Sequence, residues 1–461
     1  MSDETTAPAT EETEDLTLKE NFRLLLKASK GFWLVNQINF LDGIAYFGIL
    51  MLLTRYLGPS GLGMTDQLTG FSVSLYTGLV TLFMFGGGFV SDRLGVRRAL
   101  TWSLIVIGAG RVILTAAPAF SETSHIAAWT GLMLMALGTG VMQPALYAGI
   151  KEYTDPRTAT IGYGLLYSIM NLGIVAESFI SPLIRSDATF LNLGFMEIVG
   201  LGWGINGVYW TAVAITGLML LVHITFFTKK IEDNDRTVAA KETDENETGK
   251  TWIDKLKELP FADPRFMFFI FILLPVRTIF AHDFLTVPDY VFRCFPEAVS
   301  AKYEWIHGMN PLIIVIFVPT IAALTRKKKI IDMMIIGTAI TATIPFILGP
   351  GPALWTLLTY VTIYSFGEAV WSSRFLEYVA DLAPAGRVGA YMGLAGIPWF
   401  MAKFTTGLYS GSMLARFVPE TGPHNSGTMW VIYACMALIS PVGLILAKPW
   451  LIKGVKAKGE K

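Results

Sequence analysis

The chain has 461 residues, of which 53% are hydrophobic and 16% are charged. A soluble globular domain carries closer to a quarter charged residues, so this composition excludes an ordinary water-soluble protein and favours one that faces lipid. The 36 basic and 36 acidic side chains cancel. The net charge therefore gives no reason to expect a nucleic-acid partner.

Hydropathy divides the chain into a polar start and a series of apolar runs. Residues 1–30 are acidic and lack the basic patch and apolar core of a cleaved signal peptide, so we expect a disordered cytoplasmic tail. The sequence then predicts an all-α membrane protein with twelve transmembrane helices. The runs lie at 33–56, 68–90, 99–118, 125–150, 160–184, 205–228, 265–292, 306–325, 330–349, 353–380, 388–414 and 428–448.

The runs fall into two groups of six. Residues 229–263 between the groups are charged and poor in large apolar side chains, as expected of a solvated linker. We therefore expect one six-helix bundle over 31–228, a second over 264–450 and a cytoplasmic tail over 451–461.

Lysine and arginine in the loops predict the orientation, because cytoplasmic loops carry an excess of both. Most of the loop cations fall on one side of the predicted membrane, which is the side of both chain ends. We therefore expect both termini in the cytoplasm of an inner-membrane protein. The few basic residues predicted on the outer side are Arg55, Arg185, Arg293, Lys302 and Arg416.

The loop between the second and third runs reads GGGFVSDRLGVRR over 86–98. It resembles the signature loop of the major facilitator superfamily, GxxxDRxGRR, and the resemblance implies a fold of two six-helix bundles. A glycine allows helices to approach closely, and an acid can meet the positive end of a neighbouring helix. The residues expected to control the inner gate are Gly88, Asp92, Arg93, Arg97 and Arg98.

Several further segments together resemble the proton-dependent oligopeptide transporters. They are LGTGVMQP at 137–144, YGLLYSIMNLG at 163–173, MNPLIIVIFVP at 309–319, GEAVWSS at 367–373, DLAPAGRVGAYMGL at 381–394 and PWF at 398–400. The resemblance covers nearly all of the membrane-spanning part. It implies that the substrate pocket is lined by Gln143, Asn171, Asn310, Glu368 and Trp399, and that Glu368 takes part in proton coupling. A packing role is the alternative for Trp399.

The first run departs from the family pattern ExxERFxYYG. Asn39 and Asp42 take the places of its two glutamates, and Gly43 takes the place of its arginine. In the fourth run, Gln143 replaces the family's lysine. Two cations that would meet a peptide carboxylate are therefore missing.

Ionisable residues also occur inside the predicted spans. A charge at the centre of a bilayer costs a few kcal/mol, so such residues usually face a cavity and serve function. Their signs nearly balance, which favours pairing across a central cavity. They are Asp42, Arg111, Glu177, Arg277, His282, Asp283, Glu368, Arg374 and Lys403.

The acidic members of this set and His282 are the candidates for proton coupling. Asn39, Asp42 and Tyr46 share one helical face, so we expect them to line the cavity, with Asp42 taking up and releasing a proton. A structural hydrogen bond is the alternative for Asp42. His282 is either a second proton carrier or a solvated side chain, since the ordinary pKa of histidine is about 6.5. The other candidates are Glu177, Asp283 and Glu368.

The cations are candidates for substrate binding. Arg374 and Lys403 could replace the two lost cations and hold an anionic group of the substrate, and Arg277 is a further candidate for substrate binding. For Arg374, the alternative is a side chain that snorkels to the inner membrane surface.

The sequence favours a proton-coupled symporter that moves small peptides or related zwitterionic solutes by alternating access. A proton-driven exporter of drug-like or lipid-like solutes and a non-transporting sensor are the alternatives, and the oligomeric state stays open. An enzyme is not indicated, because no nucleophile and base set, phosphate loop, metal-ligand cluster or cofactor motif occurs. The expected partners are protons, a small solute and the lipid bilayer.

Overall fold

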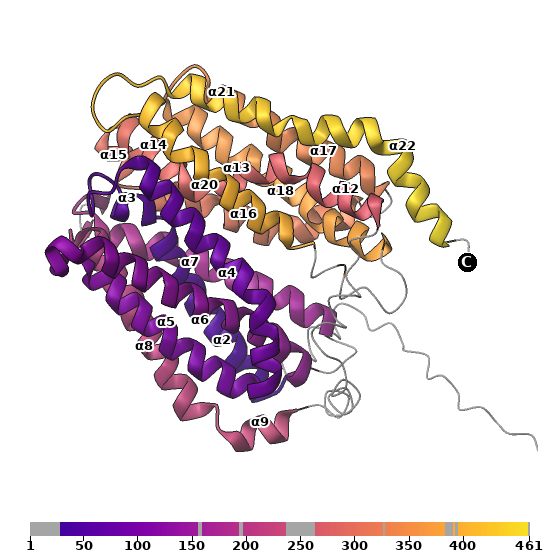
Figure 1. Cartoon of the computed structure of the whole chain (residues 1–461), viewed down its shortest axis with the longest axis horizontal. Helices are drawn as coiled ribbons and strands as arrows, with labels where there is room; N and C mark the ends of the chain where they lie inside the picture. The colour runs from indigo at the N-terminus through magenta and orange to yellow at the C-terminus, as the bar shows by residue number, and fades with distance from the viewer. Residues whose placement is uncertain are drawn as a thin grey trace, which may run out of the picture.

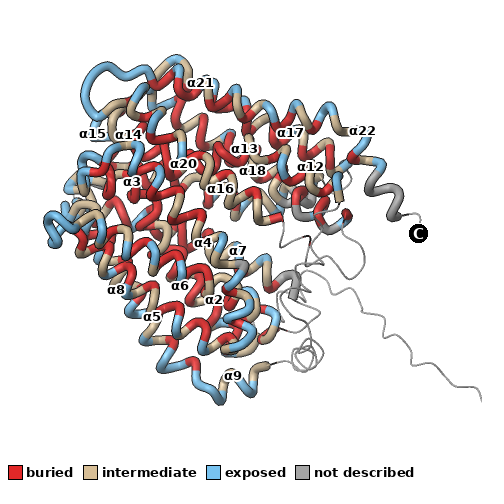
Figure 2. The backbone as a smooth tube through the Cα atoms, in the orientation of Figure 1, coloured by how far each residue is buried: buried red, intermediate tan, exposed pale blue. Residues whose placement is uncertain are grey.

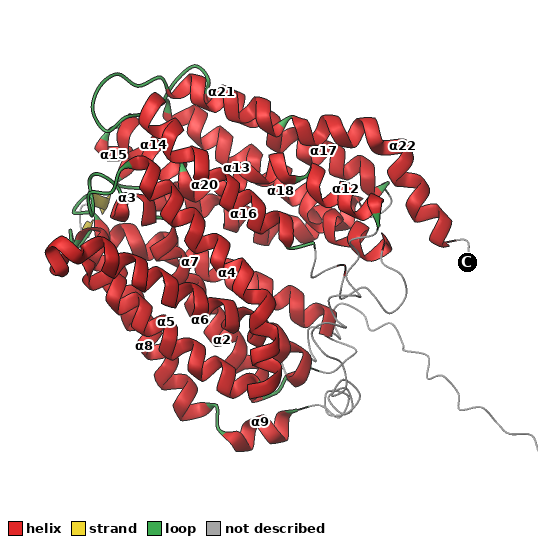
Figure 3. Cartoon of the chain, viewed as in Figure 1, coloured by secondary structure: helices red, strands yellow, loops and turns green. Residues whose placement is uncertain are grey.

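The structure is a computed structural model that describes residues 28–154, 159–192, 197–236, 263–325, 328–382, 391 and 395–459. Most of the tail predicted at 1–30, most of the predicted linker, and all but Tyr391 of the segment 383–394 lie outside the described residues. Within those residues the chain is almost entirely helical (Figure 3).

The first half of the chain contains six spans and a small hairpin. Strands β1 and β2 pair antiparallel and lie between the fifth and sixth spans. The elements are α2 Lys30–Leu50, α3 Leu53–Leu57, α4 Asp66–Leu94, α5 Val96–Ala116, η1 Ala117–Thr123, α6 Ser124–Tyr153, α7 Ala159–Arg185, β1 Thr189–Asn192, β2 Glu197–Val199 and α8 Gly204–Phe226.

The second half repeats the arrangement after the short helix α9. Several spans are built from two or three consecutive helices. The elements are α9 Lys229–Asp235, α12 Pro264–Ile272, α13 Leu274–Leu285, α14 Val287–Cys294, α15 Glu297–Ser300, α16 Tyr303–Thr325, α17 Ile330–Thr343, η2 Ile344–Leu348, α18 Leu354–Leu382, α20 Ile397–Phe417, α21 Ser426–Ala437 and α22 Ile439–Gly459.

The prediction of a twelve-helix membrane protein is confirmed, because every predicted run coincides with a described helix or a short series of helices. Eight stretches of the described chain are long and apolar enough to cross a membrane by themselves, and the stretch Val96–Tyr153 contains two of the predicted spans. The remaining spans, α2, α18 and α20, carry buried polar residues that lower their hydropathy. Large apolar side chains also face outward, such as Leu221, 64% exposed, and Leu446, 78% exposed, as lipid contact requires.

The seventh span bends because prolines interrupt its backbone hydrogen bonds. Pro275 follows the break at Leu273, and Pro288 follows the break at Thr286. At the first break, the backbone N–H of Val276 donates instead to the Ser440 hydroxyl of the twelfth span, at 2.9 Å. Such replacement partners allow a broken helix inside a membrane.

The two halves lie side by side and contact each other through α4 with α20 and α7 with α16 (Figure 1). The end of the molecule that carries α3, α14, α15 and the hairpin is called the distal end. The opposite end, with the start of α2, α9 and the C-terminus, is called the proximal end. Buried residues run along the inner sides of the helices, and exposed residues cover the outer sides (Figure 2).

The predicted linker begins with structure, because its first seven residues form α9. Glu232 of α9 pairs with Arg97 at 2.9 Å, and the Asp235 carboxylate accepts a hydrogen bond from the backbone N–H of Gly31 at 2.8 Å. The sequence suggested a solvated segment here. Helix α9 instead packs on the first half, since its acids find partners there.

Candidate functional site

Asp42 lies in a buried ion pair inside the first half. Its carboxylate is 2.7 Å from the guanidinium of Arg111 on α5, and Arg111 also donates to the Thr216 hydroxyl of α8 at 2.5 Å. Both charged side chains are almost fully buried. The pair thus ties α2, α5 and α8 together, which agrees with the structural alternative for Asp42. Its role as a proton carrier stays a prediction.

The other members of the α2 face contact different helices. Asn39 donates to the Leu166 carbonyl of α7 at 2.6 Å, and the Tyr46 ring lies 6.3 Å from the Tyr76 ring of α4. Asn39 is therefore held by a neighbouring helix, while Tyr46 is half-buried, and the lining of a cavity by this face stays a prediction. A helical face of this spacing points into a bundle interior as readily as into a cavity.

Gly43 explains why the family's arginine is missing. A Cβ atom at Gly43 would lie 2.8 Å from the Met170 carbonyl oxygen and 3.2 Å from the Cα of Gly173. Helices α2 and α7 thus cross so closely that any side chain at this position would collide with backbone. The first half cannot place a cation here without moving α7.

Ion pairs join the two halves at the distal end. Arg293 of α14 contacts Asp66 of α4 at 2.6 Å and Glu420 at 2.8 Å, while Arg55 contacts Asp289 at 3.0 Å. Their side chains are largely buried, except for that of Glu420, which is one-third exposed. These charges hold the distal ends of the halves together.

A second ion pair between the halves connects α7 and α16. Arg185 contacts Glu304 at 2.6 Å and donates to two backbone carbonyls before α16. Ser181 donates to the same glutamate at 3.3 Å. Because Glu304 is completely buried, Arg185 supplies the charge that makes its burial tolerable.

Glu177 lies one turn before Ser181, and its surroundings differ from those of Glu304. It is 2% exposed, and neither carboxylate oxygen has a hydrogen-bond partner among the described residues. It borders a cavity of about 10 Å³ that is also lined by Gly48 and Ser181, which is room for roughly one water molecule. An ionised carboxylate is costly in such a place.

His282 and Asp283 of α13 have separate environments. The His282 ring is fully buried, with one nitrogen 2.8 Å from the Thr286 hydroxyl and the other 3.0 Å from the Tyr409 hydroxyl. The ring also stacks on Tyr433. The sequence left open that His282 is a solvated side chain, and its complete burial excludes this alternative. Asp283 pairs at 3.0 Å with His307 of α16, a partner that the sequence did not reveal.

Glu368 lies near the middle of α18 and is held by Asn310 of α16. The Asn310 amide donates to the Glu368 carboxylate at 2.9 Å and contacts the Ser365 hydroxyl at 3.1 Å. Glu368 and Asn310 are partly exposed. The structure therefore brings together two residues that the sequence assigned to the pocket. Asn171 donates to a carbonyl of its own helix, and Gln143 is partly exposed on α6.

Two cations of the second half lie against aromatic rings. The Arg277 guanidinium of α13 is 4.4 Å from the centre of the Phe375 ring, 5.1 Å from that of Trp399 and 5.6 Å from that of Trp371. The Lys403 ammonium of α20 is 5.7 Å from the centre of the same Trp399 ring. Trp399 is thus a shared surface for both cations, which goes beyond simple packing.

Arg374 is placed differently from these two cations. It pairs with Glu377 one turn further along α18 and donates to the Thr325 hydroxyl at the end of α16, at 2.9 Å. Both partners lie toward the proximal end. This position agrees with the alternative that the Arg374 side chain snorkels to the inner membrane surface. Its role in substrate binding stays a prediction.

The predicted gate residues lie at the proximal end, where α4 meets α5. Asp92, Arg93 and Arg98 are exposed, and Gly88 is partly exposed. Arg97 pairs with Glu232 of α9, and the backbone carbonyl oxygen of Arg97 lies 3.0 Å from a ring nitrogen of His223 on α8. The sequence did not reveal this connection to α9.

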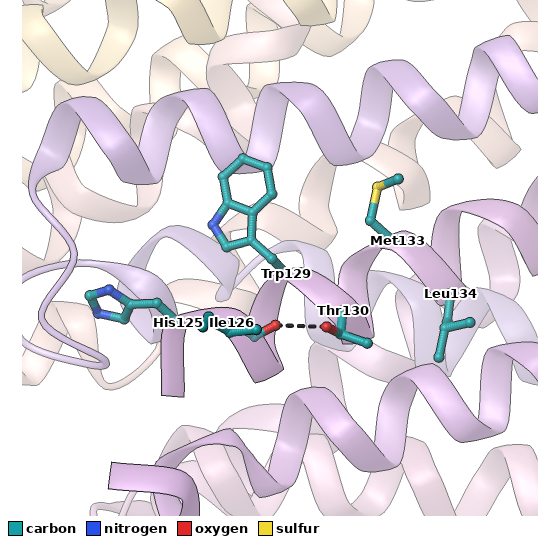
Figure 4. A pocket seen from close by; sticks show the side chains of 6 residues that line it. All are labelled: His125, Ile126, Trp129, Thr130, Met133 and Leu134. Atoms are coloured by element: carbon teal, nitrogen blue, oxygen red, sulfur yellow. Dashed lines mark hydrogen bonds between the residues drawn. The ribbon is translucent and has the colours of Figure 1, made fainter. Parts of the chain in front are cut away.

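A shallow hollow of about 550 Å³ lies on the outer face of α6 toward the distal end (Figure 4). Its lining is mostly apolar, and its hydrogen bond from Thr130 to the Ile126 carbonyl, 2.8 Å, lies within α6. None of the intramembrane charges lines it. We therefore assign this hollow to lipid contact and the charged helices between the halves to function.

Comparison with known proteins identifies the family. The model of the Major Facilitator Superfamily matches residues 32–407, and this chain belongs to that superfamily. The predictions of a major facilitator fold and of a transporter instead of an enzyme are thereby confirmed.

Individual relatives and solved structures agree with this result. The dipeptide and tripeptide permease A of Proteus mirabilis is 22% identical over 89% of this chain and 91% of its own length. The di-/tripeptide transporter of Lactococcus lactis subsp. cremoris is 31% identical over 34% of this chain and 31% of its own length. A solved peptide transporter POT in complex with sulfate superposes with a TM-score of 0.71 at 18% identity, covering 94% of this chain and 99% of that one. The predicted resemblance to peptide transporters is confirmed.

Proposed function

We propose that this protein is a proton-coupled symporter that carries small peptides or related zwitterionic solutes. The observation that supports the substrate class is a likeness over about nine-tenths of both chains to a dipeptide and tripeptide permease. The fold supplies two halves that can rock about a site between them, as alternating access requires.

The distal end faces the outside of the inner membrane, and both termini lie in the cytoplasm. Lysine and arginine gather at the proximal end, which supports this orientation through the positive-inside rule. The ion pairs of Arg293, Arg55 and Arg185 then form an outer gate in its closed state. The conformation described here would release solute toward the cytoplasm.

Glu177 is the leading candidate for the proton that drives transport. Among the described residues its buried carboxyl group, next to the outer gate, makes no ion pair, so the closed gate accepts it best when it is neutral. Opening the gate would expose the group to the outside, where it exchanges its proton. Glu368 is the second candidate, because its carboxylate is partly exposed and has the Asn310 amide as its partner. Asp42, His282 and Asp283 have partners that serve a structural role equally well.

The solute would lie between the halves, against Asn310 and Glu368 on one side and Gln143, Asn171 and Tyr46 on the other. The Glu368 carboxylate is suited to a protonated amine, because a charge-assisted hydrogen bond is stronger than a neutral one. Gly88, Asp92, Arg93, Arg97 and Arg98 would control the inner gate.

The test is uptake of labelled dipeptides into proteoliposomes with an imposed inward proton gradient. We expect wild type to accumulate dipeptide, and Glu177→Gln to lose at least tenfold in gradient-driven accumulation while it keeps peptide exchange without a gradient. Glutamine keeps the shape but cannot release a proton. Exposed Glu122 provides the control, Glu122→Gln, and Asp42→Asn tests the pair with Arg111.

The outcomes separate the alternatives. Loss of both accumulation and exchange in Glu177→Gln would make Glu177 a structural residue. If accumulation survives in Glu177→Gln but disappears in Glu368→Gln or Asp42→Asn, then Glu368 or Asp42 carries the coupled proton instead of Glu177. Absence of uptake for every peptide would reject the substrate class, and accumulation driven by the opposite gradient would identify an exporter.

A further inference from the structure

Arg277 and Lys403 lie in the interior of α13 and α20, buried and half-buried respectively, and neither has an acidic partner among the described residues. Other buried arginines in the described chain have one: Arg111 has Asp42, Arg185 has Glu304, Arg293 has Asp66 and Arg374 has Glu377. Within the same described residues, Arg277 and Lys403 make no ion pair, and two guanidinium nitrogens of Arg277 lack any hydrogen-bond partner. These two positions therefore break the pairing rule that the molecule otherwise follows.

An unpaired buried charge costs free energy, and the other contacts of the folded protein do not fully offset this cost. An uncompensated buried charge destabilises a protein strongly, and the attraction of a cation to an aromatic face offsets this cost only in part. The rings of Phe375, Trp371 and Trp399 keep Arg277 charged without neutralising it. The positive charge stays available for an anion that arrives from outside the protein.

We infer that Arg277 and Lys403, which both lie against the Trp399 ring, form a subsite that binds the anionic group of the solute. The chemical class is a carboxylate or a group of similar geometry and charge. Lys403 is partly exposed and makes the first contact, while Arg277 is 1% exposed and adds its charge from behind the rings. The inference deepens the proposed function and rests on it for the zwitterionic class.

The first half supports this assignment because its described residues offer no free cation at the corresponding depth. Gly43 has no space for a side chain, Gln143 is neutral, and Arg111 is bound to Asp42. An anionic group therefore has to be recognised by the second half.

The geometry of α18 also orients the solute. Glu368, Trp371 and Phe375 follow at spacings of three and four residues, so they share one face of the helix. Glu368 marks the acidic end of this face, and the two rings next to Arg277 mark the basic end. A short zwitterion would thus lie along α18, with its amine toward Glu368 and its carboxylate toward Trp399.

Calorimetric titration of the purified full chain with three probes tests the subsite. The probes are alanylalanine, its C-terminal amide and glutarate, and the variants are Lys403→Gln, the charge-conserving Lys403→Arg and the control Lys448→Gln, which removes a lysine paired with Asp332 of α17. We expect wild type and Lys448→Gln to bind the dipeptide at least tenfold more tightly than its amide. This preference should fall below twofold in Lys403→Gln and return in Lys403→Arg, and Arg277→Met should reduce it as well.

Each outcome decides the inference. An unchanged preference for the free carboxylate in Lys403→Gln would overturn it, even if peptides are transported. Binding of glutarate that depends on Lys403, without binding of either alanine compound, would keep the anion subsite and reject peptides as substrates. Failure of all three probes to bind would overturn the subsite.

Discussion

At the scale of single residues, the sequence identified the intramembrane charges but not their partners. Asp42 and Arg111 were both recognisable as costly residues inside spans. Their pairing depends on how α2, α5 and α8 rotate against one another, which no local pattern specifies. The same holds for Asp283 with His307 and for Arg185 with Glu304. The contact between Asn310 and Glu368 could be predicted, because the resemblance assigned both residues to one pocket.

Arg111→Met should destabilise the first half, because it leaves the Asp42 carboxylate buried without its counter-ion. We expect the free energy of unfolding to fall by about 3 kcal/mol. Adding Asp42→Asn should recover most of this loss, since no charge then stays buried. Unfolding of the purified protein in mixed micelles measures both changes. Exposed Arg416 supplies the control Arg416→Met, and equal losses in the single and double variants would contradict the argument.

At the scale of elements, hydropathy located the first ten spans to within a few residues, because lipid demands long apolar runs. The last helix, α22, continues eleven residues beyond its predicted end. Hydropathy predicted 265–292 as a single span but did not reveal that this span is broken into α12, α13 and α14, nor that α9 forms. The replacement partner at the first break, Ser440, comes from the far end of the chain. Helix α9 is charged and short, and its contacts with Arg97 and Gly31 stabilise it.

The crossing of α4 and α20 gives the second prediction. A Cβ atom at Gly407 would lie 2.0 Å from the Cβ of Ser74, and the Ser74 hydroxyl already donates to the Phe404 carbonyl at 2.6 Å. Gly407→Val should therefore force the halves apart at the distal end. Spin labels can be attached at Ser60→Cys and Thr421→Cys after the two native cysteines are removed by Cys294→Ser and Cys435→Ser. Pulsed electron paramagnetic resonance should then show a longer mean distance between the labels in Gly407→Val. An unchanged distance distribution would mean that α20 absorbs the valine by shifting along α4.

At the scale of the whole molecule, the sequence predicted two bundles and their orientation but not which end is closed. The apolar pattern of each span is the same whether the distal ends meet or separate. The choice depends on a small difference between two packed states. In this structure the buried charges of Arg293 and Arg55 favour the state in which the distal ends meet.

Arg293→Gln should shift this balance toward the open distal end. Arg293 holds Asp66 of one half and Asp289 and Glu420 of the other, and loss of a buried partner costs about 3 kcal/mol. Such a change alters the ratio of the two states roughly a hundredfold. Deuterium exchange in the distal segments 58–65 and 418–425 should accelerate, whereas Arg416→Gln at the same end should leave it unchanged. Equal exchange in all three proteins would show that the gate does not depend on Arg293.

The contacts of α9 also decide where the chain can be interrupted. Because Glu232 and Asp235 bind the first bundle, that bundle ends after α9 and not at the end of α8. A fluorescent protein or an affinity tag inserted after Arg236 would leave these contacts in place. The same insertion at Thr228, the residue that caps α9, would separate Arg97 from its acid. The practical border between two independently engineered halves therefore lies after residue 236.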